Sequence, residues 1–347
     1  MTDGAILPDE TFWSALSVSI SDNAPNYTGR IARLNSCEIN QDGEFVLYWM
    51  TASRRYHHNS ALEHSIALAI ELERPLLVVE PVSIRHTWSS DRILTFFAQG
   101  IIDNNAIFAS NRITYVPWVE THKQTGNGLL KKLSKKSCAV VIDDFPTYMP
   151  RDVARRAKKL VQCSVQCIDS NGIVPMRAPQ RSFSTAHSFR RYIHKNVLNF
   201  IASPPEAEPL KLLKDLPDGT QIATQCFKDA EIPQTPLEFI WRVSEASREG
   251  IEALAVLDID HEVPPIDDRR GGSLTARTVL KKFIEQKLDS YHIDRNHPER
   301  QGGSGLSPWL HYGHISSFEI VHEVLESQKW NPMKITHPHN DTHNSTY

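Results

Sequence analysis

Five short apolar runs, separated by stretches with helical periodicity, constrain the fold of the first half of this 347-residue chain. Each run is nearly continuous and contains many β-branched residues, which is typical of strands buried on both faces of a parallel sheet. Their regular alternation with helical stretches predicts an α/β fold with a doubly wound parallel sheet. The runs are Phe45 to Trp49, Pro75 to Val79, Ile113 to Val119, Ala139 to Ile142 and Val165 to Ile168.

The first helix between two of these runs has a recognisable beginning. Ser60 followed by Glu63 forms a capping box ahead of apolar residues at 62, 66 and 70. We therefore expect the first crossover helix to start at Ser60.

The sequence pattern divides the chain into five parts. An N-terminal extension covers residues 1–30, and the α/β domain covers residues 31–175. Residues 176–245 lose the alternation and contain proline-rich, mixed-polarity sequence, which predicts a connector between domains. Residues 246–330 return to helical periodicity, and residues 331–347 form a polar, histidine-rich tail.

Two helices are expected on either side of a glycine-serine turn in the helical part. The second begins at Ser316, where Glu319 completes a capping box and Ile315 with Ile320 forms a hydrophobic staple. The first carries one apolar stripe at helical spacing. The residues of this stripe are Val279, Leu280, Phe283, Ile284, Leu288 and Tyr291.

Composition places the chain among ordinary globular proteins. Hydrophobic residues make up 40% and charged residues 23%, and the length suffices for about two domains with a sizeable core. The formal net charge of −3 gives no global signal for nucleic acid, so a DNA-binding face would be a local basic patch. Five cysteines without a CxxC pair predict reduced thiols rather than a disulfide framework or a zinc site.

No segment of the sequence is typical of targeting or membrane insertion. The N-terminus lacks a basic region followed by a long apolar run, and no stretch approaches the ~18 apolar residues of a membrane span. We therefore expect no membrane segment and a cytoplasmic location. The GxSxG, HExxH and P-loop spacings are also absent, which leaves hydrolase and NTPase functions without support.

The glycine-serine turn is the strongest candidate for a binding site. Residues 302–307 read GGSGLS. The glycines allow backbone N–H groups to approach an anion closely, and the serines add hydroxyl donors. Pro308 favours a first helical turn, so a short helix can follow with its positive end towards the same turn. This arrangement indicates a phosphate site.

The amino-acid sequence of this segment resembles that of a known family. Residues 304–313, SGLSPWLHYG, match the FAD pyrophosphate loop of the class II DNA photolyases, which reads roughly S-x-L-S-P-Y-L-H-F-G. Trp309 and Tyr312 differ from that pattern, but each keeps a large ring. The match extends over roughly residues 31 to 330 in the family's order. The further matching segments are 43–69 with YWMTASRR, 140–151, 168–179 and 185–195.

The resemblance implies light-driven DNA repair. In this family, reduced FAD donates an electron to a cyclobutane pyrimidine dimer flipped out of the duplex and recovers the electron after the dimer splits. The implied partner is damaged DNA that contains pyrimidine dimers, and a second, antenna chromophore of unknown identity is implied in the α/β domain. The FAD contacts that the resemblance implies here are Tyr291, Ser304, Gly305, Leu306, Ser307 and His311.

The helical part is shorter than the FAD domain of this family. The family's domain continues past the loop with helices that enclose the flavin, contact the lesion and carry an electron-transfer chain, whereas this sequence ends at Tyr347. We therefore expect residues 246–330 to form an incomplete all-helical FAD-binding domain, with weak or no FAD binding by this chain alone, and we assign no catalytic residues. Two alternatives stay open: a cryptochrome-like flavin photoreceptor, and a truncated remnant that acts as a binding module.

An incomplete domain would leave an apolar helix face uncovered. We expect Leu280, Ile284 and Leu288 to be exposed where the further helices of the family would pack. A contiguous apolar patch of this kind predicts self-association.

A basic segment interleaved with aromatic residues is the candidate DNA-binding face. Arg190, Arg191 and Lys195 are interleaved with Phe189 and Tyr192, and their charges could follow a phosphate backbone. A solvated helix face is the alternative interpretation. Three further basic residues belong to the same cluster, namely Arg177, Arg181 and His194.

Two other polar groups are interpreted without a ligand. Asp143 and Asp144 end a predicted strand at the carboxyl edge of the sheet, where α/β proteins bind ligands, but without a second motif we interpret them as loop caps. The tail histidines His337, His339 and His343 are irregularly spaced, so we expect no metal site there.

Overall fold

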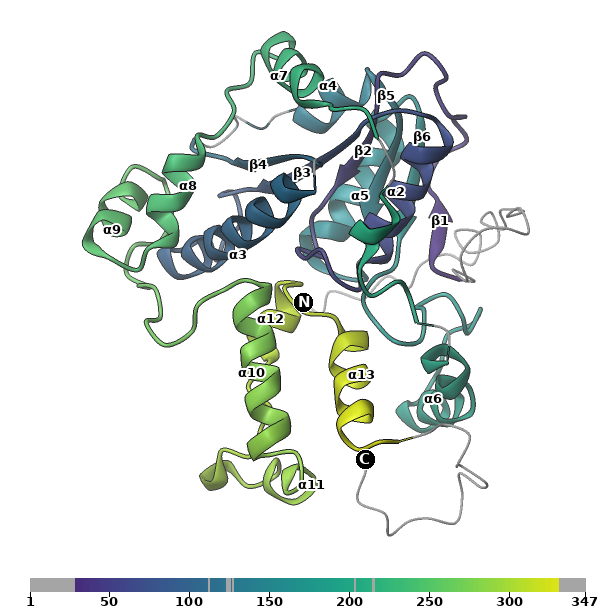
Figure 1. The fold of residues 1–347 in the computed structure, drawn as a ribbon, viewed down its shortest axis with the longest axis vertical. Helices are drawn as coiled ribbons and strands as arrows, with labels where there is room; N and C mark the ends of the chain where they lie inside the picture. The colour runs from purple at the N-terminus through teal and green to yellow at the C-terminus, as the bar shows by residue number, and fades with distance from the viewer. Residues whose placement is uncertain are drawn as a thin grey trace, which may run out of the picture.

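A computed structural model describes residues 29–330 except 112, 123–125, 127, 203 and 214–215. Figure 1 shows a sheet with helices on both of its faces, and below it a group of helices formed by the C-terminal part. The N-terminal extension up to residue 28 and the polar tail with its three histidines lie outside the described residues.

The described residues contain one six-stranded sheet with the strand order β1-β6-β5-β2-β3-β4. The strands are β1 (Ile31–Arg33), β2 (Phe45–Trp49), β3 (Leu76–Val82), β4 (Thr114–Val119), β5 (Ser137–Asp143) and β6 (Ser164–Ile168). The strands β2 to β6 are parallel to one another, and each coincides with one of the five apolar runs. The predicted doubly wound parallel sheet is therefore confirmed.

The edge strand β1 was not predicted. It pairs antiparallel with β6, so that Ile31 lies opposite Ile168. This strand has three residues and mixed polarity, so it gives no apolar run in the sequence. Its charged residue Arg33 pairs with Glu38 at 2.8 Å. A short, charged strand is typical of a sheet edge that resists pairing with other chains.

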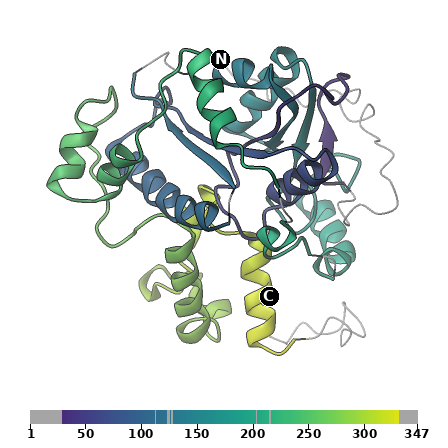
Figure 2. The same ribbon diagram turned by 45° about the horizontal axis from the view of Figure 1, so that its top comes forward.

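Helices cover both faces of the sheet, because alternate side chains of each strand point to opposite faces. The covering helices are α2 (Ser60–Glu71), α3 (Asp91–Ser110), α4 (Leu129–Ser134), α5 (Tyr148–Leu160) and α7 (Thr220–Asp229). α2 and α3 pack on the face that carries Tyr48 and Val78. α4, α5 and α7 pack on the opposite face, which carries Leu47 and Val79. Figure 2 shows the same layers from a second direction.

Asn59, rather than Ser60, caps the first crossover helix. The Asn59 backbone is extended and its side-chain oxygen accepts a hydrogen bond from the Leu62 N–H at 3.0 Å, while Ser60 is already helical. The expected cap at Ser60 is therefore wrong by one position. Asparagine and serine have similar N-cap preferences, so the sequence alone does not separate two adjacent candidates.

The segment expected to be a connector contains packed helices. Phe227 of α7 is buried against the sheet, and Ile240 of α8 (Leu237–Ser244) is buried against α3. Residues 176–245 therefore contribute to the core around the sheet as well as leading to the C-terminal helices. Their helical periodicity was hard to detect because the helices are short and separated by prolines. The new elements in and after this segment are α6 (Ala186–Ile201), the 3-10 helix η1 (Pro209–Leu212), α8 (Leu237–Ser244) and α9 (Arg248–Leu254).

The C-terminal helices form a second, smaller apolar cluster. They are α10 (Ser273–Gln286), α11 (Tyr291–Asp294), η2 (Pro298–Arg300), α12 (Ser307–His311) and α13 (Ser317–Ser327). The cluster includes Phe283 and Trp309, and Phe96 of α3 joins it from the sheet domain. Ser316 caps α13 as predicted, because its hydroxyl accepts a hydrogen bond from the Phe318 N–H at 3.1 Å.

The apolar stripe of α10 is not the exposed surface that the sequence analysis expected. Leu280 is only 2% exposed, and Ile284 and Leu288 pack partly buried against the same cluster. Leu306 and Trp309 belong to this cluster, so the segment around α12 covers the stripe. The expectation that Leu280, Ile284 and Leu288 are exposed is therefore wrong, and the expected self-association rested on that exposure.

The cysteines are free thiols, as predicted. Four of the five are buried, and burial raises the pKa of Cys167 well above its ordinary value. As to membranes, no helix in the described part of the chain is long and apolar enough to cross one.

Candidate functional site

The glycine-serine turn lies between η2 and α12, and its backbone requires glycines. A Cβ at Gly302 would come within 2.4 Å of Asp294, and Gly305 has a left-handed φ of 73°. Among the described residues, no atom lies within 4 Å of a Cβ placed on Gly303, and one placed on Gly305 meets only Val279 Cγ1, at 3.9 Å. The turn therefore leaves open space beside its backbone, as a bound phosphate requires.

The expected cofactor contacts near this turn differ in what they can offer a ligand. Ser304 is half-buried and Ser307 is exposed. Leu306 is 1% exposed within the helical cluster, so only its backbone can face a ligand. Tyr291 packs edge-on against Phe283, with ring centroids 5.2 Å apart. The hydroxyls of the two serines are therefore candidate donors to an anion at the turn.

His311 lies at the end of α12, one turn beyond Ser307 at its start. Trp309 in its middle is buried, and its indole N–H donates to the Arg270 carbonyl at 3.1 Å. His311 at its end is exposed, and it lines a cavity together with Tyr312. Neither Ser304 nor Ser307 lines that cavity. The structure therefore places His311 at a second site.

This second site is a cavity of about 350 Å³ at the carboxyl ends of the strands, and we call it the strand-end cavity. β2 has β3 on one side and β5 on the other, so the chain path reverses here. Such switch points are the usual ligand sites of α/β sheets. The lining combines aromatic residues with aliphatic and small polar ones. It includes Trp88, Phe97, Phe145, Tyr148, Tyr312, His86, His311 and Arg54.

The sequence analysis assigned no residue to the strand-end cavity, although a signal was present. Trp88 and Tyr148 line it and are each 71% exposed. Both occur shortly after a predicted strand, at the sheet edge where ligands bind. Large aromatic residues in those two loops were the available indication of a binding site.

Asp143 fixes the turn that forms one wall of the cavity. Its carboxylate accepts hydrogen bonds from the N–H groups of Thr51 and Ala52 at 2.7 Å and of Ser53 at 3.1 Å. The Tyr48 hydroxyl also donates to it at 2.8 Å, and burial raises the pKa of Tyr48 well above its ordinary value. Asp143 is therefore a loop cap, as the sequence analysis interpreted it.

A buried ion pair supports the same turn. Arg54 donates to Glu80 Oε1 at 2.9 Å, and the two side chains are 2% and 0% exposed. Asn104 and the Tyr115 hydroxyl donate to Glu80 Oε2, so both carboxylate oxygens have partners. The Arg54 guanidinium lies 4.5 Å from the centroid of the Phe97 ring. These contacts hold Arg54 in one orientation at the cavity wall.

The segment after α12 is attached to this turn through close backbone contacts. Gly313 has a φ of 76°, and a Cβ there would collide with the Ala52 carbonyl. Its own carbonyl accepts a hydrogen bond from Arg55 at 3.1 Å. His314 is 1% exposed, and its Nδ1 accepts from the Gly272 N–H at 2.9 Å. Burial, together with nearby arginines, lowers the pKa of His314 to about 3, so the imidazole is neutral.

The basic residues expected to bind DNA lie together on α6. Arg190, Arg191 and Lys195 are exposed, and no residue of α6 is buried. Arg177, from the same expected cluster, instead forms an ion pair with Asp144 at the end of β5. Figures 1 and 2 show α6 and α10 on opposite sides of α13. The α6 cations are therefore separate from the glycine-serine turn.

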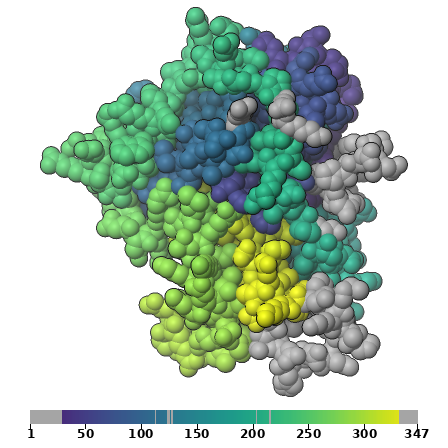
Figure 3. All heavy atoms as spheres, in the orientation of Figure 1, coloured from purple at the N-terminus to yellow at the C-terminus, as the bar shows by residue number. Residues whose placement is uncertain are grey.

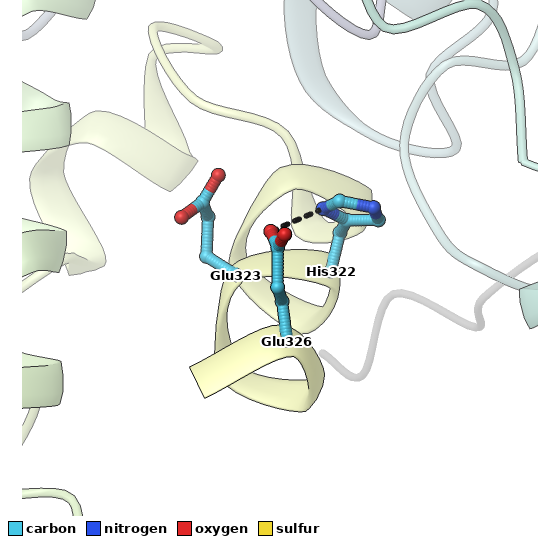
Figure 4. A group of neighbouring side chains, drawn as sticks. All are labelled: His322, Glu323 and Glu326. Carbon is cyan, nitrogen blue, oxygen red and sulfur yellow. Dashed lines mark ion pairs between the residues drawn. The ribbon is translucent and has the colours of Figure 1, made fainter. Parts of the chain in front are cut away.

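One exposed group on α13 has the atoms of a metal site. The candidate ligand atoms of His322, Glu323 and Glu326 all lie within 4.8 Å of one another. Figure 4 shows His322 facing Glu326, with Nδ1 and Oε2 3.9 Å apart. All three side chains are exposed, and such acidic groups are common on helix surfaces without an ion. We assign no metal to this group, which the sequence analysis had not singled out.

Comparison with known proteins relates this geometry to a family. No family profile matches the chain. A deoxyribodipyrimidine photo-lyase of Methanothermobacter thermautotrophicus is 26% identical over 300 residues, which cover 86% of this chain and 60% of the relative. One from Arabidopsis thaliana is 24% identical over 304 residues, which cover 84% and 55%. These similarities support the photolyase family.

Solved photolyase structures share the fold. A bacterial class III photolyase from Agrobacterium tumefaciens gives a TM-score of 0.51 at 17% identity, covering 81% of this chain and 52% of its own. An archaeal photolyase from Sulfolobus tokodaii with two FAD molecules gives 0.52 at 13% identity, covering 85% and 60%. The chain thus spans little more than half the length of these photolyases and of the curated relatives.

Proposed function

We propose that this chain belongs to a light-driven DNA repair enzyme that uses FAD to split cyclobutane pyrimidine dimers. The observation that carries the proposal is the glycine-serine turn, whose sequence matches the family's pyrophosphate loop and whose backbone leaves room for an anion. The curated relatives are named photo-lyases, which favours repair over a photoreceptor or a non-catalytic module. The sequence of the turn and of the other matching segments favours the class II subtype.

The turn fits the phosphate part of FAD. Gly303 and Gly305 leave the space beside the backbone, while Ser304 and Ser307 supply hydroxyl donors. Bound FAD would supply the electron for the reaction, and the chain's own contribution would be to hold and orient its phosphates. The apolar residues of α10 are already packed in the helical cluster, so they provide no wall for the flavin ring. We therefore expect this chain alone to bind FAD weakly.

The strand-end cavity fits a second, light-absorbing chromophore. Its aromatic walls suit a flat conjugated ring system, and Arg54, His86 and His311 can fix polar substituents. Its volume of about 350 Å³ lies at the lower end of the range for ligand pockets. A single ring system therefore fits better than a whole dinucleotide. The Sulfolobus tokodaii photolyase is described with two FAD molecules and a light-harvesting cofactor.

For contact with damaged DNA we propose α6. Arg190, Arg191 and Lys195 are exposed on this one helix, and their charges can neutralise backbone phosphates without reading sequence. Recognition of the dimer itself would require residues beyond this helix. α6 therefore supplies affinity rather than specificity.

A repair assay with a chimera tests the proposed function. The chain is fused to the C-terminal helices of the Methanothermobacter relative, loaded with FAD, and illuminated with a dimer-containing oligonucleotide. We expect light-dependent repair, and we expect Ser307→Glu to weaken flavin retention at least about tenfold by placing a negative charge beside the phosphates. Thr278→Glu, an exposed site on α10, is the matched control and should retain flavin. A folded chimera without flavin or repair would contradict the proposal.

A further inference from the structure

A second groove runs along the open edge of the sheet, and we call it the β4 groove. It has a volume of about 520 Å³ and lies between β4, α3, α7 and the residues that lead into α8. Figure 1 shows β4 at the margin of the sheet, between α3 and the segment that carries α7 and α8, and Figure 3 shows the surface in the same orientation. Its polar lining consists mainly of hydroxyl and amide side chains. These polar residues are Asn105, Thr114, Asp218, Thr220, Thr224, Gln234 and Thr235.

The hydrogen bonds of β4 show which of its backbone groups face this groove. Along a strand, alternate residues direct their N–H and C=O groups to opposite sides. The Glu120 N–H donates to the Val82 carbonyl of β3 at 2.8 Å, so the even-numbered residues face β3. Val119 faces outward, because its N–H donates to the Thr235 hydroxyl at 2.8 Å and its carbonyl accepts from that hydroxyl at 3.1 Å. The other odd-numbered residues share this outward direction.

The open part of the edge is three residues long. At one end the Thr235 hydroxyl occupies the outward N–H and carbonyl of Val119. At the other end the Gly219 N–H donates to Thr114 Oγ1 at 3.1 Å. Between these closures, Tyr115 directs an N–H and a carbonyl outward, while Pro117 directs only a carbonyl. At ~3.3 Å per residue, this opening is about 10 Å long. It matches about three residues of an extended peptide.

The charge of the groove restricts its occupant further. Asp218 is the only charged side chain among the described residues that line it. A hydrogen bond from the Thr220 hydroxyl lowers the pKa of Asp218, so the carboxylate is ionised at neutral pH. A positively charged side chain is therefore complementary to this groove, whereas a negatively charged one is not.

We propose that the β4 groove binds an extended peptide segment of about three residues that carries a lysine or arginine side chain. The peptide adds a strand beside Tyr115, donating two N–H groups to the outward carbonyls and accepting one hydrogen bond from the Tyr115 N–H. Its cationic side chain meets Asp218 on the α7 side of the groove, and the side chains next to it point to the opposite side, where Asn105 of α3 lies. The proposal does not depend on FAD or DNA binding.

The probe is the peptide acetyl-Thr-Val-Lys-Val-Thr-amide, titrated into the full chain labelled with ¹⁵N-tyrosine and ¹⁵N-threonine. We expect saturable shifts at the Tyr115, Thr220 and Thr224 amides. Replacing the peptide lysine by glutamate should weaken binding roughly tenfold, because the charge pair becomes repulsive. Two further peptides are N-methylated, one at the lysine and the other at the two valines. Because only alternate N–H groups of the peptide face β4, only one of these two peptides should lose binding.

Variants of the chain separate the contributions. Asp218→Asn should weaken binding of the lysine peptide roughly fivefold and leave a glutamine version of the peptide unaffected. Thr224→Trp should block every peptide, whereas Gln221→Trp, exposed on the same helix, is the matched control. The proposal is overturned if the lysine peptide gives no saturable shifts or if both methylated peptides bind equally well. It is also overturned if Tyr115 shifts with protein concentration alone, because the edge would then pair with a second copy.

Discussion

The sheet and the C-terminal helices are stabilised in different ways. The strands β2, β3, β5 and β6 contribute buried side chains to clusters on both faces of the sheet, and those clusters join segments far apart in the chain. Among the described residues, the helical cluster contains only seven buried apolar side chains, and one of them, Phe96, comes from α3. The helices therefore depend on the sheet domain for part of their core, whereas the core of the sheet contains no residue from them.

The contacts between the two regions are partly polar and partly aromatic. Arg55 donates to the Gly313 carbonyl, and Arg270 pairs with Asp103 at 2.8 Å. Phe96 of α3 stacks on His314, with ring centroids 5.0 Å apart. Regions with few buried apolar contacts open before the rest of a protein unfolds. The glycine-serine turn belongs to the C-terminal helices, so we expect it to lie on the less stable of the two regions.

The largest expected effect comes from the buried ion pair of the sheet domain. Glu80→Gln leaves the Arg54 charge buried without its counter-charge, and breaking such a pair costs about 3–5 kcal/mol. We expect urea unfolding to show a loss of this size for the whole domain. Glu252→Gln, which removes the exposed pair with Arg248, is the control and should leave the midpoint unchanged. An equal loss in both variants would contradict the assigned role of the buried pair.

A cavity in the helical cluster should have a large but local effect. Phe283 is 6% exposed, and Phe283→Ala removes a contact that joins α10 to Tyr291. Replacing a buried phenylalanine by alanine lowers the free energy of unfolding by about 3–5 kcal/mol. We expect amide hydrogen exchange in α10 and α13 to accelerate while the protection of β2 and β5 is unchanged. Faster exchange in the strands as well would show that the two regions unfold together.

Acid should weaken the contacts between the sheet domain and the C-terminal helices. The pKa of His314 is about 3 in the folded chain and near 6.5 when unfolded, so its contribution is full above pH 6.5 and declines as the pH falls towards 3. At pH 5 the expected loss is about 2 kcal/mol. The pKa values of His57 and His58 shift in the same direction, to about 3 and about 4, because His57 is half-buried and His58 is buried. The three together should make stability fall between pH 6.5 and 4.

The measurement is the exchange of α13 amides at pH 7 and pH 5, corrected for intrinsic rates. His314→Asn retains an acceptor for the Gly272 N–H but does not titrate. We expect this variant to lose about one third of the acid dependence. A variant with the full acid dependence would assign the effect to the other two histidines.

The sequence predicted the parts of this molecule whose signals are local. The strands β2 to β6 were predicted because each is a buried apolar run, and α13 was predicted from the cap at Ser316. β1 was missed because three residues of mixed polarity carry no pattern. The exposure of Leu280 was wrong because its cover comes from Leu306 and Trp309, residues separated from it in the sequence.

The candidate sites follow the same rule. The glycine-serine turn is continuous in sequence and was predicted from its residues, with its role taken from the family resemblance. The strand-end cavity draws its walls from the loops after β2, β3 and β5 and from α12, so no single segment indicates it. His311 was grouped with the serines because it is near them in sequence, but it lines the strand-end cavity, which neither serine lines. Only the fold shows which of two neighbouring sites it serves.

The smallest expected effect concerns α6, which belongs to neither core. Because no residue of α6 is buried, removing its charges should change binding without changing stability. Each phosphate neutralised contributes about −0.9 to the dependence of log K on log salt concentration. Arg190→Ala with Arg191→Ala should therefore flatten this slope by up to about two for duplex DNA. The control removes two exposed charges from α5 instead, with Arg156→Ala and Lys159→Ala, and should leave the slope unchanged. An identical slope in both variants would assign the α6 cations to solvent, and the surface that binds DNA would then have to lie outside this helix.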